Sequence, residues 1–214
     1  MDINKTCAFF LVFVAGSANA QFNQKGTVHL SLGFAAGAHG TEYEQKVRVL
    51  GAWFSDTEND GAATVTFPIE VGVGLGNAIS LGLYIEPGSY LDSSATESNG
   101  LALVGLQPRF YLVNKDRFAW LGSLQLGAGA LRIERDEPGV ESSARYAGGN
   151  FGLGTGVVFQ FTDLIGLQLH LRYMSTSLKL RDYTLNGQDV ALDDFEATLR
   201  TRGVALQASL GFRF

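Results

Sequence analysis

The stretch VALQASLGFRF at 204–214 alternates between apolar side chains and small or polar ones. A period of two is typical of a β-strand with one apolar face. The same alternation occurs in VHLSLGFAAG at 28–37. It recurs in six further segments, at roughly 63–75, 78–86, 101–113, 117–131, 149–161 and 166–178. Helical spacing appears nowhere at length, so the sequence predicts an all-β fold of eight strands.

Composition excludes several classes of protein. The chain has 214 residues, of which 46% are hydrophobic and 17% charged, with a net charge of −5. This apolar content is too high for a disordered chain. The 16 basic residues against 21 acidic ones give the wrong sign for a nucleic-acid-binding protein. No apolar run reaches the ~18 residues that a membrane-spanning helix needs.

Residues 1–20 have the pattern of a secretory signal peptide. Lys5 precedes the apolar run CAFFLVFVA at 7–15, and the small residues Ala18 and Ala20 flank Asn19. This order is typical of a segment that is cleaved during export. We expect cleavage after Ala20, which leaves residues 21–214 as one domain and removes Cys7, the one cysteine.

Short and long connections alternate between the predicted strands. The short ones fall at 76–77, 114–116 and 162–165, and the long ones at about 39–62, 87–100, 132–148 and 179–202. Transmembrane β-barrels have short periplasmic turns and long extracellular loops, whereas a soluble β-sandwich, the alternative, has no reason to sort its loops. We therefore predict an eight-stranded antiparallel up-and-down transmembrane β-barrel with both termini in the periplasm.

The polar face of the strands carries charges and amides with glycines between them, as expected for a confined interior. We expect a polar network that plugs the middle of the barrel, with Glu70 paired to Arg109 and Arg172. The alternative is a gated narrow pore in which these pairs rearrange. The predicted interior residues are Glu70, Glu86, Gln107, Arg109, Gln125, His170, Arg172 and Arg213.

With its signal, its eight amphipathic strands and its closing segment QASLGFRF at 207–214, the chain resembles the small outer-membrane β-barrels of the OmpA, OmpX and OmpW kind. The resemblance implies a bacterial outer-membrane location, contact with lipids and lipopolysaccharide, and assembly by the barrel-assembly machinery. It assigns the assembly signal to Leu210, Phe212 and Phe214. Ser209 stands where that signal often has glycine. The resemblance implies no chemistry.

Three segments depart from the simple pattern. Pro68 and Pro108 lie within predicted strands, where each removes a ladder hydrogen bond, and we expect local bulges there. The strand-like segment KVRVLGAWF, Lys46–Phe54, lies inside the first long loop. We interpret it as an extracellular extension of the first two strands. The alternative, a ninth spanning strand, would place the termini on opposite sides.

Few residues suggest catalysis or a cofactor. The three histidines, His29, His39 and His170, lack zinc-site spacing, and GVGLG at 72–76 lacks the Lys-Ser/Thr of a phosphate loop. We predict no metal and no cofactor. His29 and Ser31 share a face, and outer-membrane lipid A deacylases use a related arrangement. These two residues lie near the periplasmic end, however, and we interpret them as interior polar residues of a non-enzymatic protein.

The predicted function is a structural or surface-interaction role of a monomer, through long extracellular loops that contact an unidentified ligand. Trp53, Phe54 and Tyr90 are the candidate exposed aromatic contacts. The first alternative is a narrow channel or carrier for small or hydrophobic solutes. The second, less supported, is a lipid A-modifying enzyme.

Overall fold

The computed structural model describes residues 21–92, 99–137 and 140–214. The predicted signal peptide, with Ala18 and Ala20, lies outside the described residues and stays a prediction. Strands make up almost all regular structure in the described part. None of its residues forms a helix with the length and apolar character required to cross a bilayer.

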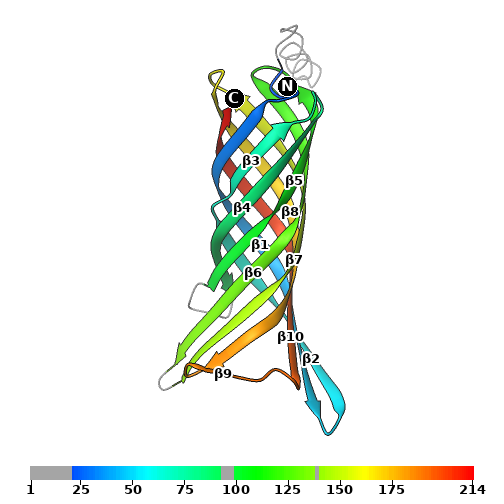
Figure 1. The fold of residues 1–214 in the computed structure, drawn as a ribbon, viewed down its shortest axis with the longest axis vertical. Helices are drawn as coiled ribbons and strands as arrows, with labels where there is room; N and C mark the ends of the chain where they lie inside the picture. Colours follow the sequence, from blue (N-terminus) through cyan, green and yellow to red (C-terminus); the bar gives the residue numbers. More distant parts are fainter. Residues whose placement is uncertain (1–20, 93–98, 138–139) are drawn as a thin grey trace, which may run out of the picture.

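In the part of the chain that the structure describes, ten strands form one antiparallel sheet (Figure 1). Several are far longer than the 9–11 residues that cross a bilayer at a tilt, so they extend beyond it. Their bounds are β1 Val28–Val49, β2 Ala52–Thr66, β3 Ile69–Gly74, β4 Ile79–Asp92, β5 Asn99–Asn114, β6 Phe118–Glu137, β7 Val140–Gln160, β8 Ile165–Leu185, β9 Gln188–Asp189 and β10 Phe195–Arg213.

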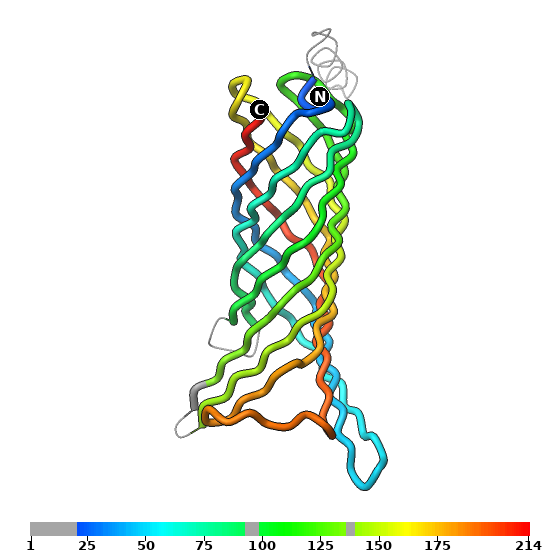
Figure 2. The backbone as a smooth tube through the Cα atoms, in the orientation of Figure 1, coloured from blue at the N-terminus to red at the C-terminus, as the bar shows by residue number. Residues whose placement is uncertain are grey.

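The strand pairings run in a ring. Each long strand pairs with its neighbours in the sequence, and β10 pairs with both β1 and β8. β3 continues the path of β2 between β1 and β4, while β9 is a two-residue strand on the end of β8. The predicted eight-stranded up-and-down barrel is therefore confirmed. Both ends of the part of the chain that the structure describes lie at the end that carries the short turns (Figure 2), which we call the turn end; the opposite end is the loop end.

The predicted bulge at Pro68 is wrong, although the strand is interrupted there. β2 ends at Thr66 and β3 begins at Ile69, and the Pro68 carbonyl accepts a hydrogen bond from the Gly33 amide (2.9 Å). The register against β1 and β4 is the same on both sides of Pro68, so no extra residue is inserted. The predicted bulge at Pro108 is wrong. Pro108 pairs with Leu81, and the β5–β6 register is the same on both sides of it. No extra residue is inserted there, and the register shifts later, between Tyr111 and Val113.

The first long loop is a β-hairpin. β1 and β2 stay paired as far as Val49 and Ala52, and only Leu50 and Gly51 form the turn. Both turn residues have positive φ, 51° and 84°, as a two-residue hairpin turn of the favoured kind requires. The prediction that Lys46–Phe54 extends the first two strands is confirmed, and the hairpin projects beyond the rest of the loop end (Figure 1).

Apolar side chains face outward and polar ones face inward. Leu206 and Leu210 of β10 are 66% and 52% exposed, whereas Arg172 of β8 is almost completely buried. A soluble protein would show the reverse. A closed antiparallel barrel with an apolar outer belt satisfies its backbone internally and meets hydrocarbon. Exposed aromatic rings near the turn end fit the interfacial girdle of such barrels; they are Phe110, Trp120, Phe159, Phe161 and Phe214.

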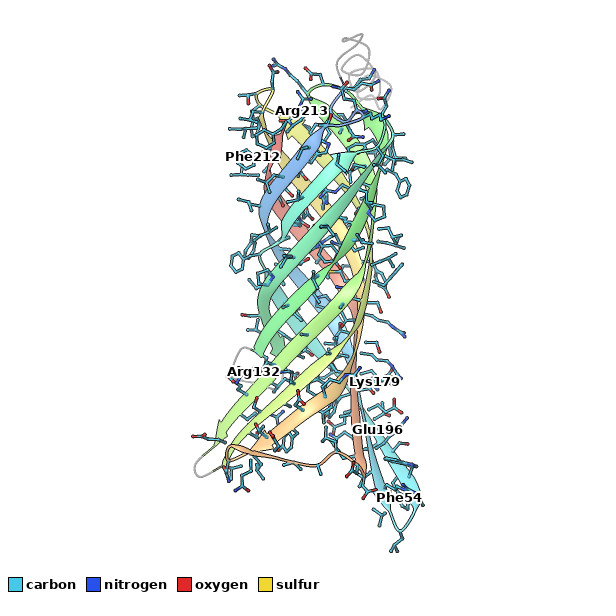
Figure 3. All side chains as sticks on the ribbon, viewed as in Figure 1. Phe54, Arg132, Lys179, Glu196, Phe212 and Arg213 are labelled. Atoms are coloured by element: carbon cyan, nitrogen blue, oxygen red, sulfur yellow. The ribbon has the colours of Figure 1, made fainter. Side chains whose placement is uncertain are left out.

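The two ends of the molecule also differ in how their side chains are placed. In Figure 3, Phe212 and Arg213 lie at the turn end, beside the chain terminus, and Phe54 lies near the tip of the β1–β2 hairpin. The assembly signal implied by the resemblance, Leu210, Phe212 and Phe214, thus lies at the turn end, on the last residues of β10 and the residue that follows it. Its recognition stays a prediction.

A charge on the outer belt tests this orientation. Replacing Leu206 by Arg places a guanidinium in hydrocarbon, and we expect a loss of about 2–4 kcal/mol in the free energy of unfolding in phospholipid bilayers. Urea titration followed by tryptophan fluorescence measures it. The matched control is Val49→Arg, at the exposed hairpin tip, for which we expect less than about 1 kcal/mol. Equal losses in the two variants contradict the orientation.

Candidate functional site

Two buried ion pairs lie inside the barrel. The pair nearer the turn end, which we call the lower pair, is centred on Glu70 of β3. Its carboxylate accepts hydrogen bonds from Ser31 Oγ (2.6 Å), from the Arg109 guanidinium and from Gln107 Nε2 (3.2 Å). Gln207 Nε2 of β10 adds a fourth donor at 3.3 Å. Arg109 in turn donates through Nε to Gln107 Oε1 at 3.1 Å. The charge of each partner is therefore compensated, as a buried ion pair requires.

The second pair, which is nearer the loop end and which we call the upper pair, joins Glu86 of β4 to Arg172 of β8 across the lumen. The guanidinium donates two hydrogen bonds, from Nη1 to Oε2 (2.8 Å) and from Nη2 to Oε1 (2.7 Å). Thr66 Oγ1 donates a third to Oε1 at 2.6 Å. Both charged side chains are 1% exposed. Such a bidentate contact holds the orientation of both side chains in addition to neutralising their charges, so the pair connects β4 and β8 rigidly.

The structure therefore corrects the expected pairing. Arg172 pairs with Glu86 and not with Glu70, because β8 faces β4 across the lumen at that height. Gln125 lies at the edge of this pair, with its Oε1 3.5 Å from Arg172 Nη1. His170 is buried, and neither of its ring nitrogens has a hydrogen-bond partner among the described residues.

Arg213 does not belong to the central network. It lies at the turn end, where its guanidinium donates to the Asp163 carbonyl (3.1 Å) and to Asp116 Oδ1 (3.1 Å). The alternation placed Arg213 on the inward face correctly, but its position at the end of β10 brings it to the short turns. It ties two turns together instead of filling the lumen.

Glycines create room for one large side chain inside the barrel. Tyr84, Gly105, Gly127 and Asn150 pair in one row across β4, β5, β6 and β7. The Tyr84 hydroxyl crosses the two glycines and donates to Asn150 Oδ1 at 2.8 Å. A Cβ on Gly127 would lie 2.8 Å from that hydroxyl. The glycine-rich strands thus allow a tyrosine to bridge strands that are not neighbours.

Residues before β1 close the turn end. Phe22 and Asn23 are fully buried. The Phe22 ring stacks on His29 with 4.8 Å between centroids, and Asn23 Nδ2 donates to the Gly76 carbonyl at 2.6 Å. Asn114 Nδ2 donates back to the Asn23 carbonyl, also at 2.6 Å. We call Phe22 and Asn23 the N-terminal plug; nothing in the alternation pattern signalled it.

A cavity with a volume of about 570 Å³ opens at the loop end of the barrel. It forms where β8 and β10 separate: their pairing ends at Lys179 and Thr198, although β8 continues to Leu185. Its aromatic and apolar lining comes from six strands and from the segment between β9 and β10. These residues are Tyr43, Tyr90, Ile133, Ala144, Tyr146, Leu180, Tyr183, Val190, Ala191, Leu192, Phe195 and Leu199. We call it the mouth cavity.

The interior narrows sharply from the mouth cavity toward the turn end. Tyr90 and Leu199 line both it and a space of about 20 Å³ that reaches Glu86. A further space beside Glu70 and Arg109 measures about 10 Å³. These volumes hold at most about one water molecule each. From the mouth cavity toward the turn end, the interior thus holds first the two ion pairs and then the N-terminal plug.

Tyr90 was expected to be exposed, and this is wrong. It is 3% exposed and faces inward. The reason is that β4 continues to Asp92, beyond the predicted strand end at residue 86. The even-numbered alternation that turns Glu86 inward therefore also turns Tyr90 inward. Trp53 and Phe54, on the projecting hairpin, are exposed as expected.

His29 and Ser31 are held by different partners. His29 Nε2 is 3.0 Å from Asn23 Oδ1, and Ser31 Oγ donates to Glu70. Both side chains are buried near the turn end, so the geometry does not present a base and a nucleophile to a lipid. Among the described residues, no three histidine, aspartate or glutamate side chains lie close enough together to hold a metal ion.

Comparison with solved structures agrees with the geometry. The outer-membrane protein OprG from Pseudomonas aeruginosa matches 92% of this chain and 99% of its own, with 11% identity and a TM-score of 0.64. The chain has the fold of a small outer-membrane β-barrel. The outer-membrane protein AlkL matches 92% of this barrel and 94% of its own chain, with 12% identity and a TM-score of 0.55.

More distant likenesses to this barrel include the outer-membrane protease OmpT from Escherichia coli, with 11% identity, coverage of 92% and 99%, and a TM-score of 0.44. No family model and no curated protein sequence matches the chain.

The upper ion pair offers a test of the interior. Glu86→Ala leaves the Arg172 guanidinium buried without its partner, and we expect a loss of about 3–5 kcal/mol in the free energy of unfolding. The double variant Glu86→Ala with Arg172→Met should recover most of that loss, because it removes both charges. Urea unfolding in bilayers measures both variants. A double variant as unstable as the single one contradicts the ion-pair account.

Proposed function

We propose that the barrel binds a small solute with an apolar part in the mouth cavity and acts as a carrier or receptor for it at the outer membrane. The observation that carries this proposal is the cavity itself: about 570 Å³, lined mainly by aromatic and aliphatic side chains. Ligand sites are typically concave, largely apolar and of about 300–1,000 Å³. The likeness to OprG and AlkL supports the fold only.

The contrast with the rest of the interior strengthens the proposal. Below the mouth cavity the lumen is filled by buried apolar side chains, among them Leu101, Leu103, Leu131 and Leu178, and then by the two ion pairs. An eight-stranded barrel has an interior just wide enough to be filled by side chains or to hold one small ligand. The barrel is built for binding at its loop end rather than for an open water path along its axis.

The structural or surface-interaction role expected from the sequence stays a prediction. The β1–β2 hairpin projects beyond the barrel wall and exposes Leu50, Trp53 and Phe54 at its end. These side chains offer a contact surface separate from the mouth cavity. The expected absence of enzymatic activity also stays a prediction.

Binding of 4-phenylbutanol tests the mouth cavity. Phe195→Ala removes an apolar wall of the cavity, and we expect about a tenfold weaker affinity, since burial of an aromatic ring contributes about 1.5–3 kcal/mol. Isothermal titration of the barrel in phosphatidylcholine nanodiscs measures it, with empty nanodiscs subtracted. The matched control is Phe161→Ala at the turn end, which should leave affinity unchanged. Unchanged affinity in Phe195→Ala overturns the assignment of the site.

Planar-bilayer recording distinguishes binding from conduction. Refolded barrel should show no reproducible single-channel steps, because the ion-pair layers and the N-terminal plug leave no continuous water path. A general porin refolded in the same way is the positive control. Defined steps from the barrel would favour the narrow-channel alternative.

A further inference from the structure

The charged residues of the mouth cavity are unevenly distributed. Glu58 and Asp60 come from β2 and Asp92 from β4, two strands that pair with each other at Ala62 and Asp92. The one basic residue among the described lining residues is Arg135 of β6. Three carboxylates against one guanidinium give this cavity a net charge of −2. The wall formed by β2 and β4 is therefore acidic, whereas much of the remaining lining is aromatic or aliphatic.

The environment of Asp92 in the acidic wall is incomplete. The Oδ1 atom of Asp92 is buried without a hydrogen-bond partner among the described residues. A carboxylate oxygen removed from water without a partner is costly, so a positive group beside it is favourable.

Tyrosines stand next to the carboxylates. Tyr43 of β1 lies directly opposite Glu58 of β2 in the register, and its hydroxyl is 3.2 Å from that of Tyr146. Tyr90 and Tyr183 also line the cavity. Tyrosine faces attract cations, and cages of aromatic rings with nearby carboxylates are the usual recognition site for ammonium groups. Tyr43 and Tyr90 lie on β1 and β4, the two strands that flank β2, so these rings and the acids together favour one class of ligand.

We propose that the ligand of the mouth cavity is an amphipathic organic cation, an amine or quaternary ammonium carried on an apolar group. The inference deepens the proposed function and rests on it. The cationic head lies against Glu58, Asp60 and Asp92, between the tyrosines. The apolar part lies against the opposite wall, formed by Leu180, Leu192 and Phe195. Arg135 opposes binding of the cation and limits its affinity.

Three probes of similar shape and different charge test the proposal. They are 4-phenylbutyltrimethylammonium, 4-phenylbutanol and 4-phenylbutanoate, titrated separately into the barrel in nanodiscs of zwitterionic phosphatidylcholine. We expect the cation to bind at least about tenfold more tightly than the alcohol, and the carboxylate to bind most weakly. Zwitterionic lipid keeps a charged bilayer surface from producing the same order.

Variants assign the preference to the acidic wall. Asp92→Asn combined with Glu58→Gln should abolish the advantage of the cation while leaving the affinity for 4-phenylbutanol unchanged. Arg135→Gln should increase the affinity for the cation. The matched control is Asp163→Asn, an exposed carboxylate at the turn end, which should alter neither.

The outcomes separate the two proposals. If none of the three probes binds, the proposed function fails and this inference fails with it. If 4-phenylbutanol binds as tightly as the cation, the mouth cavity remains a ligand site and only the inference about charge is overturned. A cation preference that persists in the double variant Asp92→Asn with Glu58→Gln also overturns it, because other residues must then recognise the positive charge.

Discussion

The pairing of β1 with β10 is the contact on which the rest of the structure depends. It runs from His29 opposite Arg213 to Val47 opposite Phe195 and joins the first long strand to the last. In hydrocarbon, an open strand edge would leave a row of amide and carbonyl groups without partners, at several kcal/mol each. Closure removes that cost. It also commits every strand to one outer and one inner face, so apolar side chains meet lipid and polar ones share a narrow space.

That narrow space explains both the chemistry of the interior and the position of the ligand cavity. Glu70 and Glu86 are stabilised by arginines and by neighbouring hydroxyl or amide donors, and two glycines let Tyr84 reach Asn150 over the strands between them. Little volume remains. Only beyond Lys179 and Thr198, where β8 and β10 separate, does the interior widen. The space that can hold a ligand therefore lies on the loop-end side of the filled part of the barrel.

The sequence predicts the fold and the faces well, and contacts across the lumen poorly. Alternation with period two fixes which way Glu70, Arg109 and Arg172 point. It cannot fix which acid Arg172 meets, because that depends on the stagger between β4 and β8, which no local pattern records. The mouth cavity was missed for another reason: the strands continue into segments rich in polar residues, where apolar alternation fades. Tyr90 could have been found by continuing the even-numbered series from Glu86.

The N-terminal plug has a consequence for the order of assembly. Phe22 and Asn23 precede every strand. Asn23 forms hydrogen bonds with Gly76 and Asn114, and Phe22 packs between the ring of His29 and the guanidinium of Arg213 from the last strand. The residues that bind the plug therefore come from the beginning, the middle and the end of the polypeptide. This binding site exists only after the final strand has joined the first, so two residues that are synthesised before every strand reach their final positions last.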